Sequence, residues 1–137
     1  MIRLAQESDI GEAVSFLQAR ELSDFAAMGL DPSAELQKLL GPYTWSGLAQ
    51  GKVICMWGLR FPPQVEMATL WLLATPGLAK HKVEFLRGSR KFVGWATAEF
   101  GPIQACTRAA ASVRWLRWAG FHEVESSYDF VRMQTDA

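Results

Sequence analysis

Cysteine and histidine are both scarce in this chain, which has two of each among its 137 residues. The cysteines, Cys55 and Cys106, lie far apart in apolar, strand-like runs, as is usual for reduced and buried thiols in an intracellular protein. The histidines are His81 and His122, and with the two cysteines far apart in the sequence there is no metal-ligand spacing. We therefore expect neither a disulfide framework nor a bound metal.

Long hydrophobic runs and the familiar catalytic signatures are also missing. The longest apolar stretch without charge, MATLWLLATPGLA at 67–79, is too short to span a membrane and contains a proline. The N-terminal MIRLAQESD has no apolar signal core. There is no nucleophile elbow, Walker loop or dinucleotide fingerprint. These absences predict a soluble, cytoplasmic protein with no membrane partner.

Net charge is zero, but the charges are unevenly distributed along the chain. The first fifty residues carry seven acidic and three basic side chains, a balance of −4. Between Leu78 and Trp118, eight basic side chains stand against two acidic ones, a balance of +6. An anionic ligand or partner would therefore be drawn to the C-terminal half.

Residue periodicity predicts a mixed α/β fold within a single domain, which suits a half-hydrophobic chain of this length. Asp9 and Glu12 resemble a capping box at the start of the first helix, and Gly51 marks a turn between two strands. Gly88-Ser89 is a weak point in the third helix. The expected strands are 2–6, 44–50, 52–61, 67–75, 102–108, 122–128 and 129–135. The expected helices are 9–17, 19–40 with a break at Gly29 and Pro32, 78–100 and 108–119. The resulting order is β-αα-βββ-α-β-α-ββ.

Three stretches and this order of elements resemble the GNAT superfamily of acyl-CoA N-acyltransferases. IRLAQESDIGEAVSFL (2–17) is similar to the opening strand and helix of that family. LLATPGLAKHK (72–82) is similar to its fourth strand and the start of its pyrophosphate-binding helix. RAAASVRWLRWAGFHEV (108–124) is similar to its penultimate helix, which ends in Gly-Phe. The resemblance implies one GNAT-like domain over residues 1–137, with a bent, mostly antiparallel mixed sheet flanked by helices.

A narrower resemblance is to the internal virion and virion-assembly proteins of short-tailed phages, through the chain length, AAMGLDPS (26–33) and the C-terminal helix. Together the two resemblances imply an acyl-CoA-dependent N-acetyltransferase of phage origin, whose activity is weak or lost. They place it in the host cytoplasm or with the virion. The implied cofactor is acetyl-CoA. Its pantetheine arm would align on Leu72, Leu73 and Ala74, and its pyrophosphate would be held by Gly77, Leu78, Ala79, Lys80, His81 and Lys82.

Several positions depart from the family pattern. The family has an Arg/Gln-x-x-Gly-x-Gly/Ala loop before the pyrophosphate-binding helix, and here only Gly77 remains of its glycines. With Gly120-Phe121 aligned, the family's helix-start asparagine falls on Ala109 and its general-acid tyrosine on Leu116. The cations at 80–82 oppose the helix dipole, so they either bind phosphate or form a solvated first turn.

Candidate catalytic groups are few. Glu66 precedes the strand 67–75 and is the best candidate for the general base that an amine acceptor requires, although loop carboxylates are often only solvated. Tyr128 or Tyr43 could replace the missing acid, but nothing in the sequence places either near the acyl group. Cys106 could line a cleft or be a small buried hydrophobe, and we expect the second.

Helical spacing separates two faces of the segment 108–119. Leu116 and its neighbours form the buried face, with Trp115 at its edge as a core residue. Arg114 and Trp118 point to the other face, with Arg117 on its flank, and Trp118 there either packs under a loop or anchors a partner. The alternative function is therefore a non-enzymatic virion-assembly or host-factor-binding protein that uses this face. We do not expect nucleic-acid binding, because basic helices are often simply solvated.

Overall fold

A computed structural model of the chain describes residues 1–15, 26–27, 29–63, 66–107, 110–127 and 130–136. Its helices and strands follow one another in the predicted order, so the predicted α/β class is confirmed. The strands are β1 (Ile2–Leu4), β2 (Thr44–Ala49), β3 (Lys52–Arg60), β4 (Ala68–Ala74), β5 (Ile103–Thr107), β6 (Phe121–Ser126) and β7 (Val131–Thr135). The helices are α1 (Glu7–Ser15), α3 (Pro32–Leu39), α4 (Lys82–Phe100) and α5 (Ala110–Ala119), and a 3-10 helix, η1 (Pro76–His81), precedes α4.

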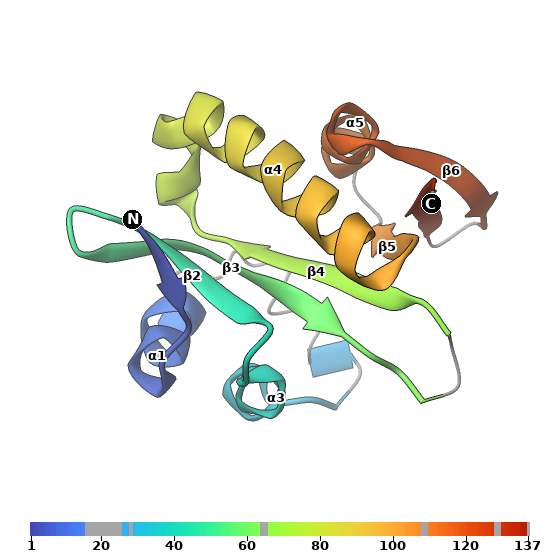
Figure 1. Ribbon diagram of the computed structural model, residues 1–137. Helices are drawn as coiled ribbons and strands as arrows, with labels where there is room; N and C mark the ends of the chain where they lie inside the picture. The colour runs from blue at the N-terminus through green and yellow to red at the C-terminus, as the bar shows by residue number, and fades with distance from the viewer. Residues whose placement is uncertain (16–25, 28, 64–65, 108–109, 128–129, 137) are drawn as a thin grey trace. The chain divides into compact units, whose positions relative to one another are not determined.

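The strands form a seven-stranded sheet in the order β1-β2-β3-β4-β5-β7-β6 (Figure 1). β1 with β2, β2 with β3, β5 with β7 and β6 with β7 are antiparallel, whereas β4 and β5 are parallel. A parallel pair needs a crossover connection, which η1 and α4 supply here. The expected mostly antiparallel, mixed sheet with flanking helices is therefore confirmed.

The predicted turn at Gly51 closes the β2–β3 hairpin. Ala49 pairs with Lys52, which leaves Gln50 and Gly51 as a two-residue loop. Both loop residues have positive φ, 53° for Gln50 and 76° for Gly51. Two such residues define a type I′ turn, whose twist matches that of the flanking strands.

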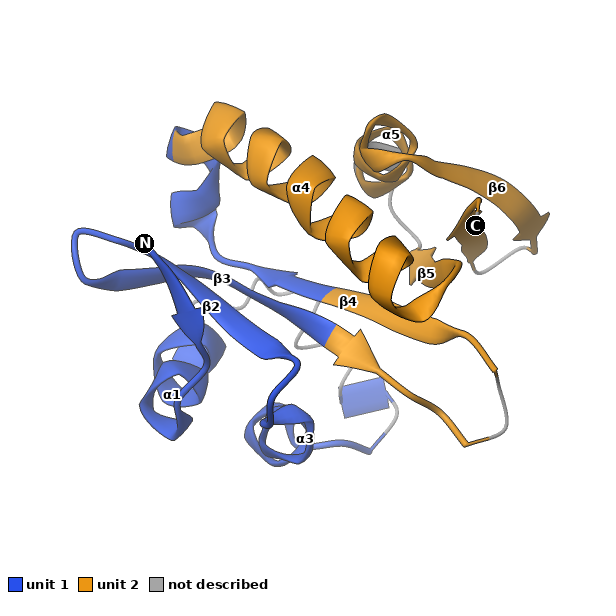
Figure 2. Cartoon of the chain, in the orientation of Figure 1, with its two compact units in different colours: residues 1–58, 72–80 blue, residues 59–71, 81–137 orange. Residues whose placement is uncertain are grey.

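The chain divides into two compact units, and each is described by itself below (Figure 2). The first unit comprises residues 1–58 and 72–80, and the second comprises residues 59–71 and 81–137. Both β3 and β4 pass from one unit into the other, because the divisions fall inside these strands.

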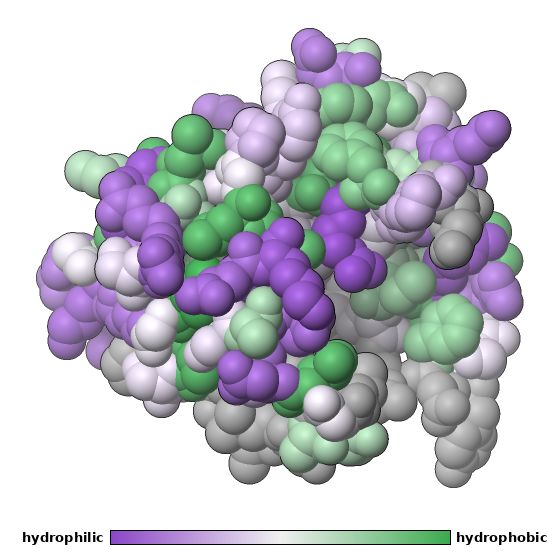
Figure 3. Space-filling model, turned by 90° about the horizontal axis from the view of Figure 1, so that it is seen from below, coloured by the Kyte–Doolittle hydropathy of each residue, from purple (hydrophilic) through white to green (hydrophobic). Residues whose placement is uncertain are grey.

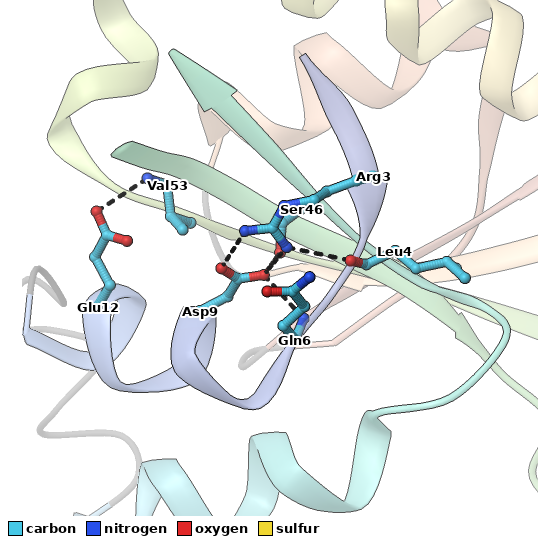
Figure 4. Close-up of polar contacts among 7 residues, drawn as sticks. All are labelled: Arg3, Leu4, Gln6, Asp9, Glu12, Ser46 and Val53. Carbon is cyan, nitrogen blue, oxygen red and sulfur yellow. Dashed lines mark hydrogen bonds and ion pairs between the residues drawn. The ribbon is translucent and has the colours of Figure 1, made fainter. Parts of the chain in front are cut away.

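In the first unit, the carboxylate of Asp9 joins β1, α1 and β2 (Figure 4). Arg3 donates two hydrogen bonds to Asp9, of 2.6 Å to Oδ2 and 2.8 Å to Oδ1. The Gln6 N–H and the Ser46 hydroxyl each donate to Asp9 Oδ2 at 2.9 Å. All of these donors lie on segments that must meet for this unit to form.

The predicted capping box is wrong in its details. Because α1 begins at Glu7, Asp9 is the third residue of the helix rather than its cap, and it reaches back to the Gln6 N–H. Glu12 does not complete the box. Its Oε1 instead accepts a hydrogen bond of 3.1 Å from the Val53 N–H of β3 (Figure 4).

The second predicted helix, 19–40, is described only in part, since residues 16–25 and 28 lie outside the described residues. Its C-terminal part is α3, which begins where the sequence indicates. Asp31 Oδ2 accepts a hydrogen bond of 3.2 Å from the Ala34 N–H, and Pro32 occupies the first turn. α1 and α3 lie side by side below the strands of this unit in Figure 1. Figure 3 views that side, where hydrophilic side chains gather at the left and centre among smaller hydrophobic areas.

In the second unit, α4 and α5 cover one face of the strands. Trp115 of α5 is half-buried, stacks on Phe85 at a centroid distance of 5.3 Å, and donates from Nε1 to Ser89 Oγ at 3.0 Å. Ser89 Oγ in turn donates to the Phe85 carbonyl at 2.7 Å. The buried side chains of this unit include Val93 and Ala96 of α4, Leu116 and Ala119 of α5, and, on the strands, Ile103, Ala105, Phe121 and Met133.

The predicted helix 78–100 is confirmed over most of its length. Two details are corrected, the residue at which it begins and the expected weak point at Gly88-Ser89. The α-helix begins at Lys82, because residues 76–81 form the 3-10 helix η1. The helix runs unbroken through Gly88 and Ser89, where the expected weak point is instead a contact with α5. Although α4 has 19 residues, no helix in the described part of the chain is both long and apolar enough to cross a membrane.

Candidate active site

β4 and β5 are paired only at the start of each strand. Their register joins Ala68 to Ile103 and Thr69 to Gln104, and no further β4–β5 pair is found among the described residues. β5 continues to pair with β7 on its other side as far as Thr107. Backbone N–H and C=O groups that lose their strand partner must bond elsewhere, and an extended ligand can supply such bonds.

Trp71 lies on β4 just beyond the last pair. Its indole Nε1 is buried and has no hydrogen-bond partner within the described part of the chain. A buried donor without a partner costs about 1–3 kcal/mol. Because side chains alternate along a strand, Trp71 is on the same face of β4 as Thr69. The unpaired donor is therefore buried on the face of β4 that also carries Thr69.

The turn after β4 belongs to the first unit up to Lys80. The Thr75 N–H donates to the Ile54 carbonyl at 3.0 Å, and Thr75 Oγ1 donates to the same carbonyl at 3.1 Å. A Cβ added to Gly77 would lie 3.2 Å from Ile54 Cγ2. Gly77 therefore permits close packing of the turn on β3.

The start of α4 combines exposed cations with a preceding 3-10 helix, η1. Within a 3-10 helix, each N–H bonds to the carbonyl three residues earlier, so η1 engages amides that a loop would leave open. His81 is the N-cap of α4 and makes no side-chain cap hydrogen bond. Lys80 and Lys82 are exposed beside it, and His81 Nδ1 lies 3.7 Å from Glu84 Oε2. An anion at this turn would meet lysine side chains more than free amides.

The structure describes only some of the remaining candidate catalytic residues. Glu66 is exposed two residues before β4. Leu116, which aligns with the family's tyrosine, is only 2% exposed in the core of the second unit. Tyr128 and Ala109 lie outside the described residues. Tyr43 is half-buried in the first unit, just before β2.

The predicted exposed face of α5 is confirmed as an exposed face. Arg114 and Arg117 are exposed, and Trp118 is 39% exposed. The Arg90 guanidinium lies 4.0 Å from the centroid of the Trp118 ring, and Arg90 Nε donates to the Trp118 carbonyl at 3.0 Å. Arg117 pairs with Glu123 at 3.2 Å. Trp118 is thus partly covered by a side chain of α4, and Arg117 is paired. Of the three, Arg114 is exposed and has no partner among the described residues.

A polar face of the second unit was not found by sequence reasoning. On β5, Ile103 and Ala105 are buried, so Gln104 and Cys106 project from the opposite face. The same alternation on β7 puts Met133 in the core and Arg132 on the opposite face. The register sets Cys106 against Arg132 across the β5–β7 pair. The period-2 pattern of IQACT and VRMQT predicts that Cys106 and Arg132 face away from the core. The expectation that Cys106 is a buried hydrophobe hid this prediction.

The expectation that both cysteines are buried is therefore wrong for Cys106, which is exposed, and right for Cys55. Burial raises the pKa of the Cys55 thiol to about 11. Desolvation also raises the pKa of Cys106; the positive charges of Arg132 and Arg60 oppose this rise, and Glu125 adds to it.

We expect one thiol to react with Ellman's reagent in the folded protein and two in denaturant. The reagent can reach only Cys106, because Cys55 is buried. The rate of the Cys106 reaction should increase as the pH rises above neutrality, because the raised pKa leaves little thiolate at neutral pH. Time-resolved absorbance at several pH values measures this. Cys55→Ser should keep the native reaction and Cys106→Ser should abolish it; a fast reaction in Cys106→Ser would contradict the assignment.

No protein-family model matches the sequence, and no curated protein matches it. Solved structures match over nearly the whole chain. The PaiA N-acetyltransferase of Thermoplasma acidophilum in complex with coenzyme A is 11% identical, covers 100% of this chain and 98% of its own, and has a TM-score of 0.67. A GNAT-family acetyltransferase from Bacillus anthracis is 9% identical, covers 97% and 92%, and has a TM-score of 0.70. A GCN5-related N-acetyltransferase from Kribbella flavida is 16% identical, covers 100% and 97%, and has a TM-score of 0.68.

The chain has the GNAT fold. At these identities the likeness establishes the architecture, and the activity has to be argued from the residues of the site. Two observations fit an acyl-CoA: the pairing of β4 with β5 stops after two residue pairs, and exposed lysines stand at the turn into α4. One observation differs from the expected glycine loop, since η1 occupies that position. In the described part of the chain, no group of three or more His, Cys, Asp or Glu side chains could hold a metal ion.

Proposed function

We propose that the protein is an acyl-CoA-dependent N-acetyltransferase. The observation that carries the proposal is the short β4–β5 ladder, which ends at Thr69 and Gln104. A ladder of this kind leaves strand edges open to an extended ligand with amide groups, such as the pantetheine arm of acetyl-CoA. The complex of the Thermoplasma acidophilum structure with coenzyme A supports this choice of ligand for the fold.

In this proposal, the backbone of Leu72, Leu73 and Ala74 aligns the pantetheine arm. The turn Gly77, Leu78, Ala79, Lys80, His81 and Lys82 holds the pyrophosphate. Because η1 engages the amides of the turn, Lys80 and Lys82 supply most of the positive charge. The basic balance of the C-terminal half attracts the same anion from a distance.

Acetyl-CoA would supply an acyl group activated as a thioester. The acceptor amine must first lose a proton, and Glu66 is the proposed base because it is an exposed carboxylate beside β4. Attack on the thioester carbonyl forms the C–N bond and breaks the C–S bond, and the thiolate that leaves takes up one proton. Tyr128 is the proposed donor of that proton on the sequence alone, since Leu116 is buried where the family has its tyrosine.

Acetyl-CoA should stabilise the folded protein if it binds. At about one hundred times its dissociation constant, we expect about 2.7 kcal/mol of added stability in thermal unfolding. Lys82→Gln should weaken binding several-fold, because it removes a cation at the start of α4. The matched control is Lys91→Gln, an exposed lysine in the middle of the same helix, which should bind as the wild type does. The absence of any shift at millimolar acetyl-CoA would overturn the proposal.

The alternative is a non-enzymatic phage virion-assembly or host-factor-binding protein on the same scaffold. The buried Leu116 and the 3-10 helix in place of the glycine loop favour it, because both remove features that the enzyme family uses. Its contact face would be Arg114, Arg117 and Trp118. Thermal unfolding with acetyl-CoA separates the two functions, since only the enzyme requires acetyl-CoA to bind. The phage origin itself remains a prediction from the sequence.

A further inference from the structure

The polar face of the second unit is an ordered array rather than a row of free side chains. We call it the Arg132 face. Gln104 Nε2 donates to Thr69 Oγ1 at 3.0 Å, which links β5 to β4. Arg132 Nη1 lies 3.4 Å from both Gln104 Oε1 and Gln134 Oε1. The members of the face are Thr69 and Trp71 on β4, Gln104 and Cys106 on β5, Arg132 and Gln134 on β7, and Glu125 on β6.

Arg132 is held in place without being saturated. Its side chain is 28% exposed, and Nε donates to Glu125 Oε2 at 3.3 Å. The two glutamine contacts are long and involve neutral oxygens, so they orient the guanidinium more than they neutralise it. Within the described residues, Nη2 makes no hydrogen bond. A planar fork with a free edge is suited to a planar anion.

A second guanidinium, outside the Arg132 face itself, adds positive charge near Cys106. Arg60, at the end of β3, is exposed and forms no hydrogen bond or ion pair with any other described residue. Its charge nevertheless reaches the Cys106 thiol, as do the charges of Arg132 and Glu125. The local balance at Cys106 is thus two positive charges and one negative charge.

Donors exceed acceptors on this face. Among the described residues, Arg60 and the free edge of Arg132 lack an acceptor, as does the buried Trp71 Nε1, while the Glu125 carboxylate is already used by Arg132. A ligand that complements such a surface is rich in acceptor oxygens and negatively charged. The net charge of +1 suits a singly charged carboxylate better than a phosphate dianion, which would leave a negative excess.

We propose that the Arg132 face binds the carboxylate of the acceptor, so that the substrates are amines that carry a carboxylate, such as free amino acids and short peptides. This inference rests on the proposed function, because it gives the acceptor class for that reaction. The array reaches the point where β4 and β5 part, since Thr69 and Gln104 belong both to the face and to the last strand pair. An acceptor held here by its carboxylate would lie at the end of the β4–β5 ladder, the feature that carries the proposed function.

The test uses matched acceptors with acetyl-CoA: each of the free amino acids, its amide, and where available the corresponding decarboxylated amine. Release of the CoA thiol gives the initial rate. We expect kcat/KM to be about tenfold or more higher for the acid than for the amide. In Arg132→Gln, KM for the acid should rise about tenfold with little change in kcat, and the preference for the acid should disappear. Arg87→Gln, which removes an exposed arginine from α4, is the matched control and should leave both constants unchanged.

A second readout needs no turnover. Calorimetry with N-acetyl amino acids and with their amides measures carboxylate recognition directly, and Arg60→Gln offers a second variant if Arg132→Gln does not fold. If acetyl-CoA stabilises the protein but acids and amides react and bind equally, the inference is wrong and the proposed function stands. If acetyl-CoA does not bind, the proposed function fails, and the calorimetry alone decides: selective binding of the acids supports a carboxylate site, and equal or absent binding overturns it.

Discussion

Asp9→Ala is expected to lower the free energy of unfolding by about 3 kcal/mol, one of the two largest single-residue effects that the structure suggests. Removing one partner of a buried ion pair costs about 3–5 kcal/mol, because the other partner is left without compensation. Asp9 is 2% exposed and accepts from Arg3, the Gln6 N–H and Ser46. The lower end of the range applies because the Arg3 side chain is 30% exposed and can be rehydrated.

The same interaction should make stability depend on pH. Burial by itself would raise the pKa of Asp9, but the hydrogen bonds from Arg3, the Gln6 N–H and Ser46 outweigh it and lower the pKa below the ordinary 3.8. A lowered pKa in the folded state stabilises the protein above the unfolded value, and this contribution is lost as the pH falls through the folded value. Urea unfolding at pH 7 and pH 3 should therefore show the effect of Asp9→Ala shrinking in acid.

Glu35→Gln is the matched control for the Asp9 variant. It removes an acidic side chain from α3 whose ion pair with Lys38, at 3.0 Å, is a helix-surface pair of the i, i+3 type. Such pairs contribute about 0.3–0.5 kcal/mol, so the urea concentration at the midpoint of unfolding should barely change. A Glu35→Gln effect as large as that of Asp9→Ala would mean that loss of charge, and not loss of the buried network, is responsible.

Leu116→Ala is expected to destabilise the protein by about 2–5 kcal/mol, which is the range for emptying a core leucine site. Leu116 is among the largest fully buried side chains of the described residues. It lies on the inner face of α5. When the leucine side chain is shortened to the methyl group of alanine, its neighbours in the core cannot fully close the space left empty. Equilibrium denaturation with a folded-state check by circular dichroism measures the loss. Val83→Ala on the exposed first turn of α4 is the control and should change stability by less than about 0.5 kcal/mol.

Leu116→Tyr adds a test with functional meaning. A tyrosine here would restore the residue type of the enzyme family, but it would overpack a well-filled core at a cost of about 1–3 kcal/mol. We expect a less stable protein with no gain in acetyl transfer, because the buried site gives the hydroxyl no route to a substrate. A stable, faster variant would show that α5 can turn this position toward the site.

The described elements could largely be predicted from local pattern. Period-2 alternation located the strands, helical spacing located α1, α4 and α5, and Asp31-Pro32 with Gly51 marked a helix start and a turn. These features depend on residues within a few positions of one another, so they are legible in the sequence. The exposed face of α5 followed in the same way, from the angle between successive helical residues.

The candidate site depended on contacts that no local pattern contains. Cys106 is exposed because the register of β5 with β7 puts it beside Arg132 on the face away from the helices. The limited β4–β5 pairing and the η1 helix in place of a loop are likewise outcomes of packing. The sequence by itself determined which segments are strands and helices, since backbone preference and amphipathic period act locally. Only the tertiary structure decided which polar side chains converge, because strand register brings together residues that are far apart along the chain.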